Sequence, residues 1–363
     1  MPLKIKTRIS MKSVSILGAS CLTLAALATT HKASALTFTP FIFGASITAA
    51  VGGTPPSPIG LAYAGDRFVG SANYPGGTQL YQSDLNGGNV QTFGAGLTGF
   101  SGEIFVASSL SSGAYGSNEI YAGAENNGSI VRIAHNGSSQ IEFTSGLTGG
   151  VRSIAFDPYG LYGNQMVVAT KAGLLYTING SGVATQLANF HEDAEGLAFS
   201  NTSFGGYQAG TLFVASEGSG AIRAVNPDGT FTTVFSVGSA ETIHFVPLNI
   251  GLSGNPVEGF YGVNYPNDIQ KISANQFMPY IGQAIVTSEV LNGNVLHGIY
   301  AIDTNFTISH IGTFPDQPED SIFVTAEAVR QHSVPDGSST VLLLLGSLGV
   351  MGGFSGRRKP QTN

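Results

Sequence analysis

Short runs of alternating apolar and polar residues follow one another from residue 36 to residue 333. Turns rich in Gly, Asn, Asp and Ser separate these runs, and no stretch of helical periodicity interrupts them. Alternation with a period of two is typical of strands that bury one face. The pattern therefore predicts an all-β domain over residues 36–333.

A unit of four strands recurs within this domain. Its second strand begins at residues 119, 165 and 211, which gives a spacing of 46 residues twice in succession. A period of 40 to 50 residues with four strands per unit predicts a β-propeller. Because the chain has no tryptophan, it does not fit the WD type of propeller, whose repeats carry a Trp-Asp pair.

The number of blades follows from the innermost strand of each unit. The inner strands are expected near Ile59, Glu103, Arg152, Glu195, Glu241 and Asp320. This predicts six blades, with seven as the alternative, because an interval of 79 residues before the last inner strand leaves room for two irregular blades. The run Thr37–Phe43 resembles an outer strand. We expect it to complete the last blade and close the ring, which removes an open sheet edge.

Composition agrees with a turn-rich domain and excludes several other classes. Glycine accounts for 50 of 363 residues, about twice the usual 7%, and tight hairpins need glycine where φ is positive. A chain that is 42% hydrophobic is not typical of disorder. A single cysteine excludes a disulfide framework.

Residues 1–35 have the three parts of a secretory signal peptide. A basic start is followed by an apolar run, Val14–Ala28, which predicts a helix, and then by small residues. Ala33 and Ala35 would define the cleavage site, leaving Leu36 as the first mature residue. The alternative, a buried core helix, does not explain why the three parts occur in this order.

Residues 334–359 form a second segment of three parts, followed by a short tail, 360–363. The segment opens with the polar motif Val334, Pro335, Asp336 and Gly337. An apolar run, Val341–Phe354, predicts an anchor helix. The segment ends with a basic stop formed by Arg357, Arg358 and Lys359. Such a stop would keep the end of the chain on the cytoplasmic side of a membrane.

This segment resembles the PEP-CTERM family of bacterial sorting tails, and most closely its variant that begins Val-Pro-Asp. Asp336-Gly337 stands where the family name has Glu-Pro. The resemblance covers residues 334–359 and implies export across a Gram-negative-type envelope. It also implies recognition by an exosortase-type sorting enzyme, cleavage or transfer near Pro335, and at least transient contact with the membrane.

Charge is distributed unevenly along the chain. Between the two basic ends lie seven basic and 22 acidic side chains, a net charge of −15. This charge disfavours nucleic acid as a partner, because a phosphate backbone attracts basic proteins.

Charged residues also share one register on the expected inner strands. Each of them precedes a large apolar residue by two positions: Glu103, Arg152, Glu195, Glu241 and Asp320. If the four carboxylates converge, they predict a metal site, with calcium as the cation, because Ca²⁺ takes six to eight oxygen ligands. The alternative is a solvated rim with ion pairs to Arg152.

The domain also resembles the NHL-repeat and gluconolactonase-like propellers. The turn Asn226–Thr230 is of the kind that joins their third and fourth strands. Glu195-Gly196 resembles the start of their Glu-Gly-Pro motif, although Leu197 replaces the proline. The gluconolactonase-like enzymes hold a metal with such a glutamate, so the resemblance implies this role for Glu195.

Two functions remain open at this point. The sequence lacks a Gly-x-Ser-x-Gly elbow, a His-Glu-x-x-His pair and a phosphate-binding loop, and we assign no catalytic residue. The first hypothesis is therefore an exported, non-enzymatic propeller that binds or scaffolds in the cell envelope or in extracellular polysaccharide. The alternative is a calcium-dependent hydrolase of the lactonase kind at the mouth of the channel.

Overall fold

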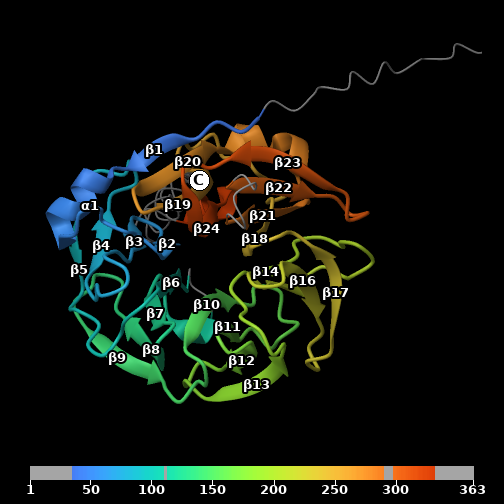
Figure 1. The fold of residues 1–363 in the computed structure, drawn as a ribbon, viewed down its shortest axis with the longest axis horizontal. Helices are drawn as coiled ribbons and strands as arrows, with labels where there is room; N and C mark the ends of the chain where they lie inside the picture. Colours follow the sequence, from blue (N-terminus) through green and yellow to red (C-terminus); the bar gives the residue numbers. More distant parts are fainter. Residues whose placement is uncertain (1–34, 110–112, 290–296, 332–363) are drawn as a thin grey trace, which may run out of the picture. The chain divides into compact units, whose positions relative to one another are not determined.

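Six four-stranded antiparallel sheets surround a central axis in the computed structural model of the chain (Figure 1). The structure describes residues 35–109, 113–289 and 297–331, and each sheet within these ranges is one blade of a β-propeller. The prediction of six blades is confirmed, and the alternative of seven is wrong. The predicted cleavage site at Ala33, the signal and anchor helices and the sorting motif lie outside the described residues.

The first four blades follow the order of the chain from the inner strand outwards. The first consists of β2 (Leu61–Tyr63), β3 (Phe68–Gly70), β4 (Leu80–Ser83) and β5 (Gln91–Phe93). The second consists of β6 (Ile104–Ser108), β7 (Ile120–Ala124), β8 (Asn127–Ile133) and β9 (Gln140–Thr144). The third consists of β10 (Val151–Phe156), β11 (Met166–Thr170), β12 (Leu174–Ile178) and β13 (Ala184–Asn189). The fourth consists of β14 (Leu197–Phe199), β15 (Leu212–Ala215), β16 (Ala221–Val225) and β17 (Phe231–Ser236).

The last two blades are interlaced along the chain. The fifth consists of β18 (Ala240–Phe245), β21 (Ala284–Ser288), β22 (Gly298–Ile302) and β23 (Ile308–Thr313). The sixth consists of β24 (Gln317–Val324), β19 (Gly259–Tyr265), β20 (Asp268–Ser273) and β1 (Thr39–Ile42). The chain thus leaves the fifth blade after its inner strand, forms the middle hairpin of the sixth blade, and returns. This detour accounts for the long interval before the last inner strand.

The N-terminal strand closes the ring. β1 pairs antiparallel with β20, with Thr39 opposite Lys271 and Pro40 opposite Gln270, so it is the outer strand of the sixth blade. On the inner side, β24 lies against β2 of the first blade. The expectation that this run completes the last blade is confirmed.

Short helices complete the described part of the chain. They are α1 (Gly44–Val51), α2 (Ala326–Gln331) and two 3₁₀ segments, η1 (Gly113–Tyr115) and η2 (Ala274–Tyr280). None of these helices is long and apolar enough to cross a membrane.

Buried tyrosines join neighbouring blades in a repeated arrangement. Tyr115, in the second blade, donates to the carbonyl of Ile178 and accepts from the N–H of Met166, both in the third blade. Tyr162 makes the corresponding pair of bonds from the third blade to Val225 and Leu212 of the fourth. Because each hydroxyl satisfies two buried backbone groups, these contacts fix how adjacent blades pack and how their inner strands meet at the axis.

Candidate functional site

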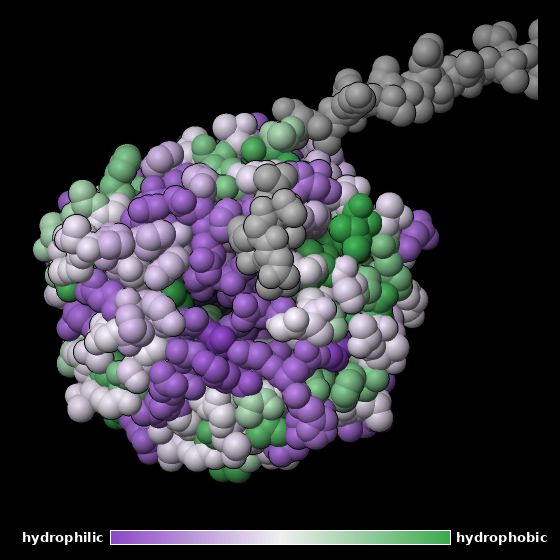
Figure 2. Space-filling view, in the orientation of Figure 1, coloured by the Kyte–Doolittle hydropathy of each residue, from purple (hydrophilic) through white to green (hydrophobic). Residues whose placement is uncertain are grey.

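The inner strands of all six blades line a cavity of about 690 Å³ at the propeller axis. Hydrophilic side chains surround the hollow at the centre of the face shown in Figure 2. Arg152, Glu195 and Glu241 lie at the end of the cavity where the inner strands begin. We call this end the channel mouth.

β-Bulges turn charged side chains towards the channel mouth. In β10 one extra residue, Arg152, lies between the pairs Val151–Thr170 and Ser153–Ala169. β18 has an extra residue between Ala240 and Ile243, where Glu241 lies. Bulges commonly re-aim a side chain beside a functional site. They are the local reason that polar groups of neighbouring blades gather here.

A third bulge, in β24, changes the register that the sequence suggested. Ser321 pairs with Gly262 and Pro318 with Asn264, so that Glu319 and Asp320 together oppose a single residue. Glu319 joins the carboxyl groups of Glu241 and Glu289 at the mouth. Asp320 was expected to take that position, and the shift of one residue explains why it does not.

Arg152 is the centre of one carboxylate group. Its guanidinium lies 2.8 Å from Asp193 Oδ2 and 2.8 Å from Glu195 Oε1, and it also contacts the carboxylate of Glu103. Glu125 lies 3.7 Å away and pairs with the Lys171 ammonium at 2.7 Å. The predicted residues Glu103 and Glu195 are therefore brought together around a buried cation of the protein itself.

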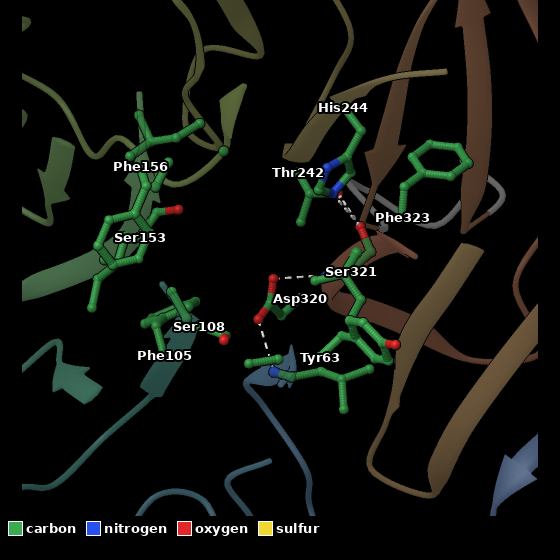
Figure 3. A pocket seen from close by; sticks show the side chains of 18 of the residues that line it. Tyr63, Phe105, Ser108, Ser153, Phe156, Thr242, His244, Asp320, Ser321 and Phe323 are labelled. Carbon is green, nitrogen blue, oxygen red and sulfur yellow. Dashed lines mark hydrogen bonds between the residues drawn. The ribbon is translucent and has the colours of Figure 1, made fainter. Parts of the chain in front are cut away.

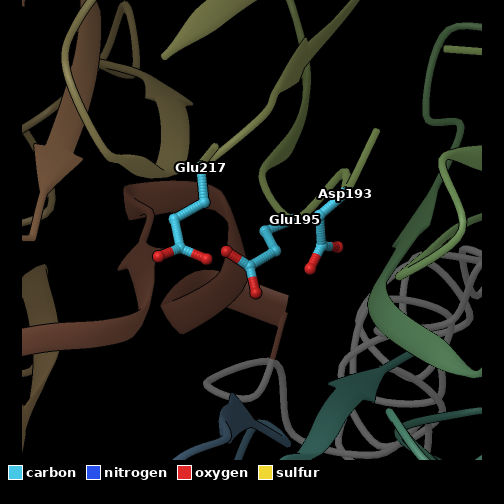
Figure 4. Close-up of side chains that lie close together, drawn as sticks. All are labelled: Asp193, Glu195 and Glu217. Atoms are coloured by element: carbon cyan, nitrogen blue, oxygen red, sulfur yellow. The ribbon is translucent and has the colours of Figure 1, made fainter. Parts of the chain in front are cut away.

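The environment of Arg152 keeps the guanidinium charged. Its side chain is only 6% exposed. Burial opposes the charge, but the carboxylates of Glu195 and Asp193 outweigh burial and raise the pKa of Arg152. Figure 4 shows Glu195 between Asp193 and Glu217, with the three carboxyl groups close together.

Glu241, Glu289 and Glu319 form the other carboxylate group of the mouth, which we call the glutamate trio. One oxygen of each lies within 4.8 Å of those of the other two. Glu241 is 2% exposed and Glu319 is 5% exposed. Burial, and then the like charges of their neighbours, raise the pKa of both carboxyls well above the ordinary value. Burial also raises the pKa of Glu289 to about 7.

Asp320 lies deeper in the cavity, where its carboxylate accepts hydrogen bonds from two backbone N–H groups. Its Oδ2 accepts the N–H of Leu61 at 2.9 Å, across the junction between the sixth and first blades, and Oδ1 accepts the N–H of Ser321 at 2.8 Å (Figure 3). Burial raises the pKa of Asp320 to about 7, although these two bonds favour the ionised form. Its position links the inner strands where the ring closes.

A hydroxyl and imidazole network lies beside Asp320. The Oγ of Ser321 is 2.9 Å from His244 Nε2 and 2.7 Å from Thr242 Oγ1 (Figure 3). Thr242 Oγ1 in turn is 2.8 Å from Thr287 Oγ1. Burial lowers the pKa of His244 to about 4. The imidazole is therefore neutral at neutral pH and joins the fifth and sixth blades by uncharged hydrogen bonds.

Several residues of the mouth were not predicted from the sequence, although three of them recur with the spacing of the repeat. Glu125, Lys171 and Glu217 follow the second strands of consecutive blades at the same spacing of 46 residues. Because the second strand runs antiparallel to the inner strand, its end lies at the mouth. Glu289 follows the second strand of the fifth blade, but the interlaced hairpin displaces it from this spacing.

Comparison with known proteins adds a likeness in fold. No protein-family model and no curated protein matches the chain. A nidogen/laminin complex aligns with a TM-score of 0.48 and 14% identity over 73% of this chain and 84% of that chain. A catalytically inactive virginiamycin B lyase from Staphylococcus aureus with quinupristin gives 0.47 and 11%, over 77% and 75%.

The WD40 β-propeller domain of Doa1 gives a TM-score of 0.44 and 10% identity, over 75% of this chain and 76% of that chain. At these values the similarity concerns the fold alone. The assignment of a six-bladed propeller rests on the order of strands in this chain itself.

Proposed function

We propose that this chain is an exported, surface-sorted β-propeller that binds a polysaccharide of the cell envelope or extracellular polymer without chemically changing it. The observation that carries the proposal is the axial cavity of about 690 Å³, which has a carboxylate-rich mouth and aromatic walls. Carboxylates accept hydrogen bonds from sugar hydroxyls, and aromatic rings offer flat apolar faces to sugar rings. A cleft of this size with few, fixed polar groups is typical of a small-ligand site.

The ion pairs of the mouth support a binding role. Arg152 holds Asp193 and Glu195 in fixed positions, and the backbone holds Asp320. Groups that are already held by charge-assisted bonds lose little conformational entropy when a ligand arrives. The acidic mouth would attract neutral or basic polymers more strongly than acidic ones.

Binding is tested with immobilised neutral and acidic exopolysaccharides. Tyr159 lines the cavity and is 47% exposed, so its removal should leave the fold intact. We expect Tyr159→Ala to weaken binding of a neutral polysaccharide about tenfold, which corresponds to about 1.4 kcal/mol. Phe231→Ala is the matched control, because this ring is 41% exposed on the outer strand of a blade. Equal affinities of wild type and Tyr159→Ala would contradict a site in this cavity.

Sorting by the tail is a separate part of the proposal. Deletion of residues 334–363 should change the distribution of the protein between envelope and medium, because it removes the motif, the apolar span and the basic stop. Deletion of residues 360–363 alone is the control and should leave the distribution unchanged. Fractionation followed by immunoblotting measures both. An unchanged location after the longer deletion would overturn sorting by this tail.

A metal-dependent hydrolase of the lactonase kind is the second candidate. One observation favours it: Glu195 and Glu241 both line the cavity at its mouth, and burial raises the pKa of Glu195 to about 7. A carboxyl that titrates near neutral pH suits general acid–base catalysis. Calcium-dependent hydrolysis of simple lactones that is lost in Glu195→Gln would favour this function over binding alone.

A further inference from the structure

No ion pair among the described residues includes a member of the glutamate trio at the channel mouth. The members of the trio come from three places that the sheets fix: Glu241 from the bulge of β18, Glu289 after the end of β21, and Glu319 from the bulge of β24. We propose that the trio binds a divalent cation, and that this cation is Ca²⁺. The inference concerns a site of its own and does not depend on the polysaccharide proposal.

The group around Arg152 differs from the trio in that it contains a cationic side chain. There, one guanidinium lies 2.8 Å from each of Asp193 and Glu195 and so compensates their charge. Within the described part of the chain, no Lys, Arg or His lies at ion-pairing distance from the trio, on which Arg152 acts only from further away. The amide of Gln317 donates to Glu289 and Glu319. Three neighbouring carboxylates at a buried position are costly, so they take up protons unless a positive charge lies among them.

A buried carboxylate oxygen outside the trio, Glu195 Oε2, lacks a hydrogen-bond partner among the described residues. The side chain of Glu195 is 3% exposed, and its Oε1 pairs with Arg152. Glu195 and Glu241 line the same mouth, and the charge of Glu195 acts on the Glu241 carboxyl. Buried acceptors are nearly always satisfied in folded proteins. A cation beside Glu241 would satisfy this oxygen and the trio together.

The ligand chemistry selects calcium. Ca²⁺ takes six to eight oxygen ligands and tolerates irregular geometry, with carboxylates that bind through one or both oxygens. The trio offers one carboxylate oxygen from each of its three members, and water or second carboxylate oxygens would complete the shell. Mg²⁺ demands near-octahedral geometry and keeps several waters, which a buried, all-carboxylate group suits less well. Calcium sites of extracellular modules bind at about 10⁻⁴–10⁻³ M, and we expect this range for an exported protein.

Calorimetry on the purified full-length chain, freed of metal with EDTA, tests the site directly. We expect one Ca²⁺ per trio in the stated range, and at least about tenfold weaker binding in Glu241→Gln and in Glu319→Gln. Glu327→Gln is the matched control, because this exposed carboxylate lines the same cavity and its replacement changes the charge equally. Its affinity for Ca²⁺ should stay within about twofold of wild type.

Thermal unfolding separates loss of a ligand from loss of the fold. Without Ca²⁺, Glu241→Gln should unfold at the same or a higher temperature than wild type, because glutamine resembles the protonated carboxyl and cannot ionise at this buried position. With Ca²⁺ the order should reverse, because only the wild type gains from the cation. The proposal is overturned if the wild type binds no Ca²⁺ at about 10 mM. It is equally overturned if Ca²⁺ stabilises both trio variants as much as wild type. No polysaccharide is present in either experiment, so these outcomes leave the binding proposal untouched.

Discussion

Replacement of Arg152 by methionine is expected to lower the free energy of unfolding by about 3–5 kcal/mol, the usual cost of removing one partner of a buried ion pair. Methionine fills most of the volume but supplies no charge. Glu103, Asp193 and Glu195 would then face one another without the guanidinium that contacts all three. The result is a loss of attraction and an added like-charge repulsion between three blades.

Urea denaturation followed by circular dichroism measures this effect as a shift of the midpoint at unchanged slope. Arg67→Met is the matched control, because Arg67 pairs with Asp66 at 2.9 Å in a more exposed position and such pairs contribute about 0–1 kcal/mol. Glu103→Gln in the Arg152→Met background should restore part of the loss, since it removes one of the repelling charges. A loss of less than about 1 kcal/mol would mean that solvent reaches the group and screens it.

The architecture was predictable because propeller blades repeat. A spacing of 46 residues and the alternation of apolar positions placed the inner strands near Glu103, Arg152, Glu195 and Glu241. The interlacing of the last two blades was not predictable. The strands of the hairpin β19–β20 look like ordinary blade strands, and which sheet they join depends on contacts that are distant in the sequence.

The site was predictable only in part, for a reason that lies in the backbone. Alignment on apolar residues assumes regular pairing, whereas bulges in β10, β18 and β24 each add a residue at the mouth. A slip of one residue turns a side chain to the other face, and this exchanged Asp320 for Glu319. The charges after the second strands could have been found, because Glu125, Lys171 and Glu217 keep the repeat spacing.

Closure of the ring by β1 leads to the second large expected effect. The ring of Phe41 packs edge-on against Phe68 of the first blade at 5.0 Å and Tyr261 of the sixth at 4.7 Å. Phe41 is 9% exposed and belongs to the apolar cluster between these two blades. Phe41→Ala should therefore lower the free energy of unfolding by about 3–5 kcal/mol, the range for removing a buried phenylalanine.

Two residues along the chain, Phe43 offers a matched control. It lies just beyond β1, and its side chain is 59% exposed, so Phe43→Ala should change stability by less than about 0.5 kcal/mol. Urea denaturation of both variants isolates the contribution of the buried ring from that of the strand itself. If Phe41→Ala matched the control, β1 would be held by its hydrogen bonds to β20 alone. The junction between the first and last blades would then depend on the inner strands, where Asp320 binds the N–H of Leu61.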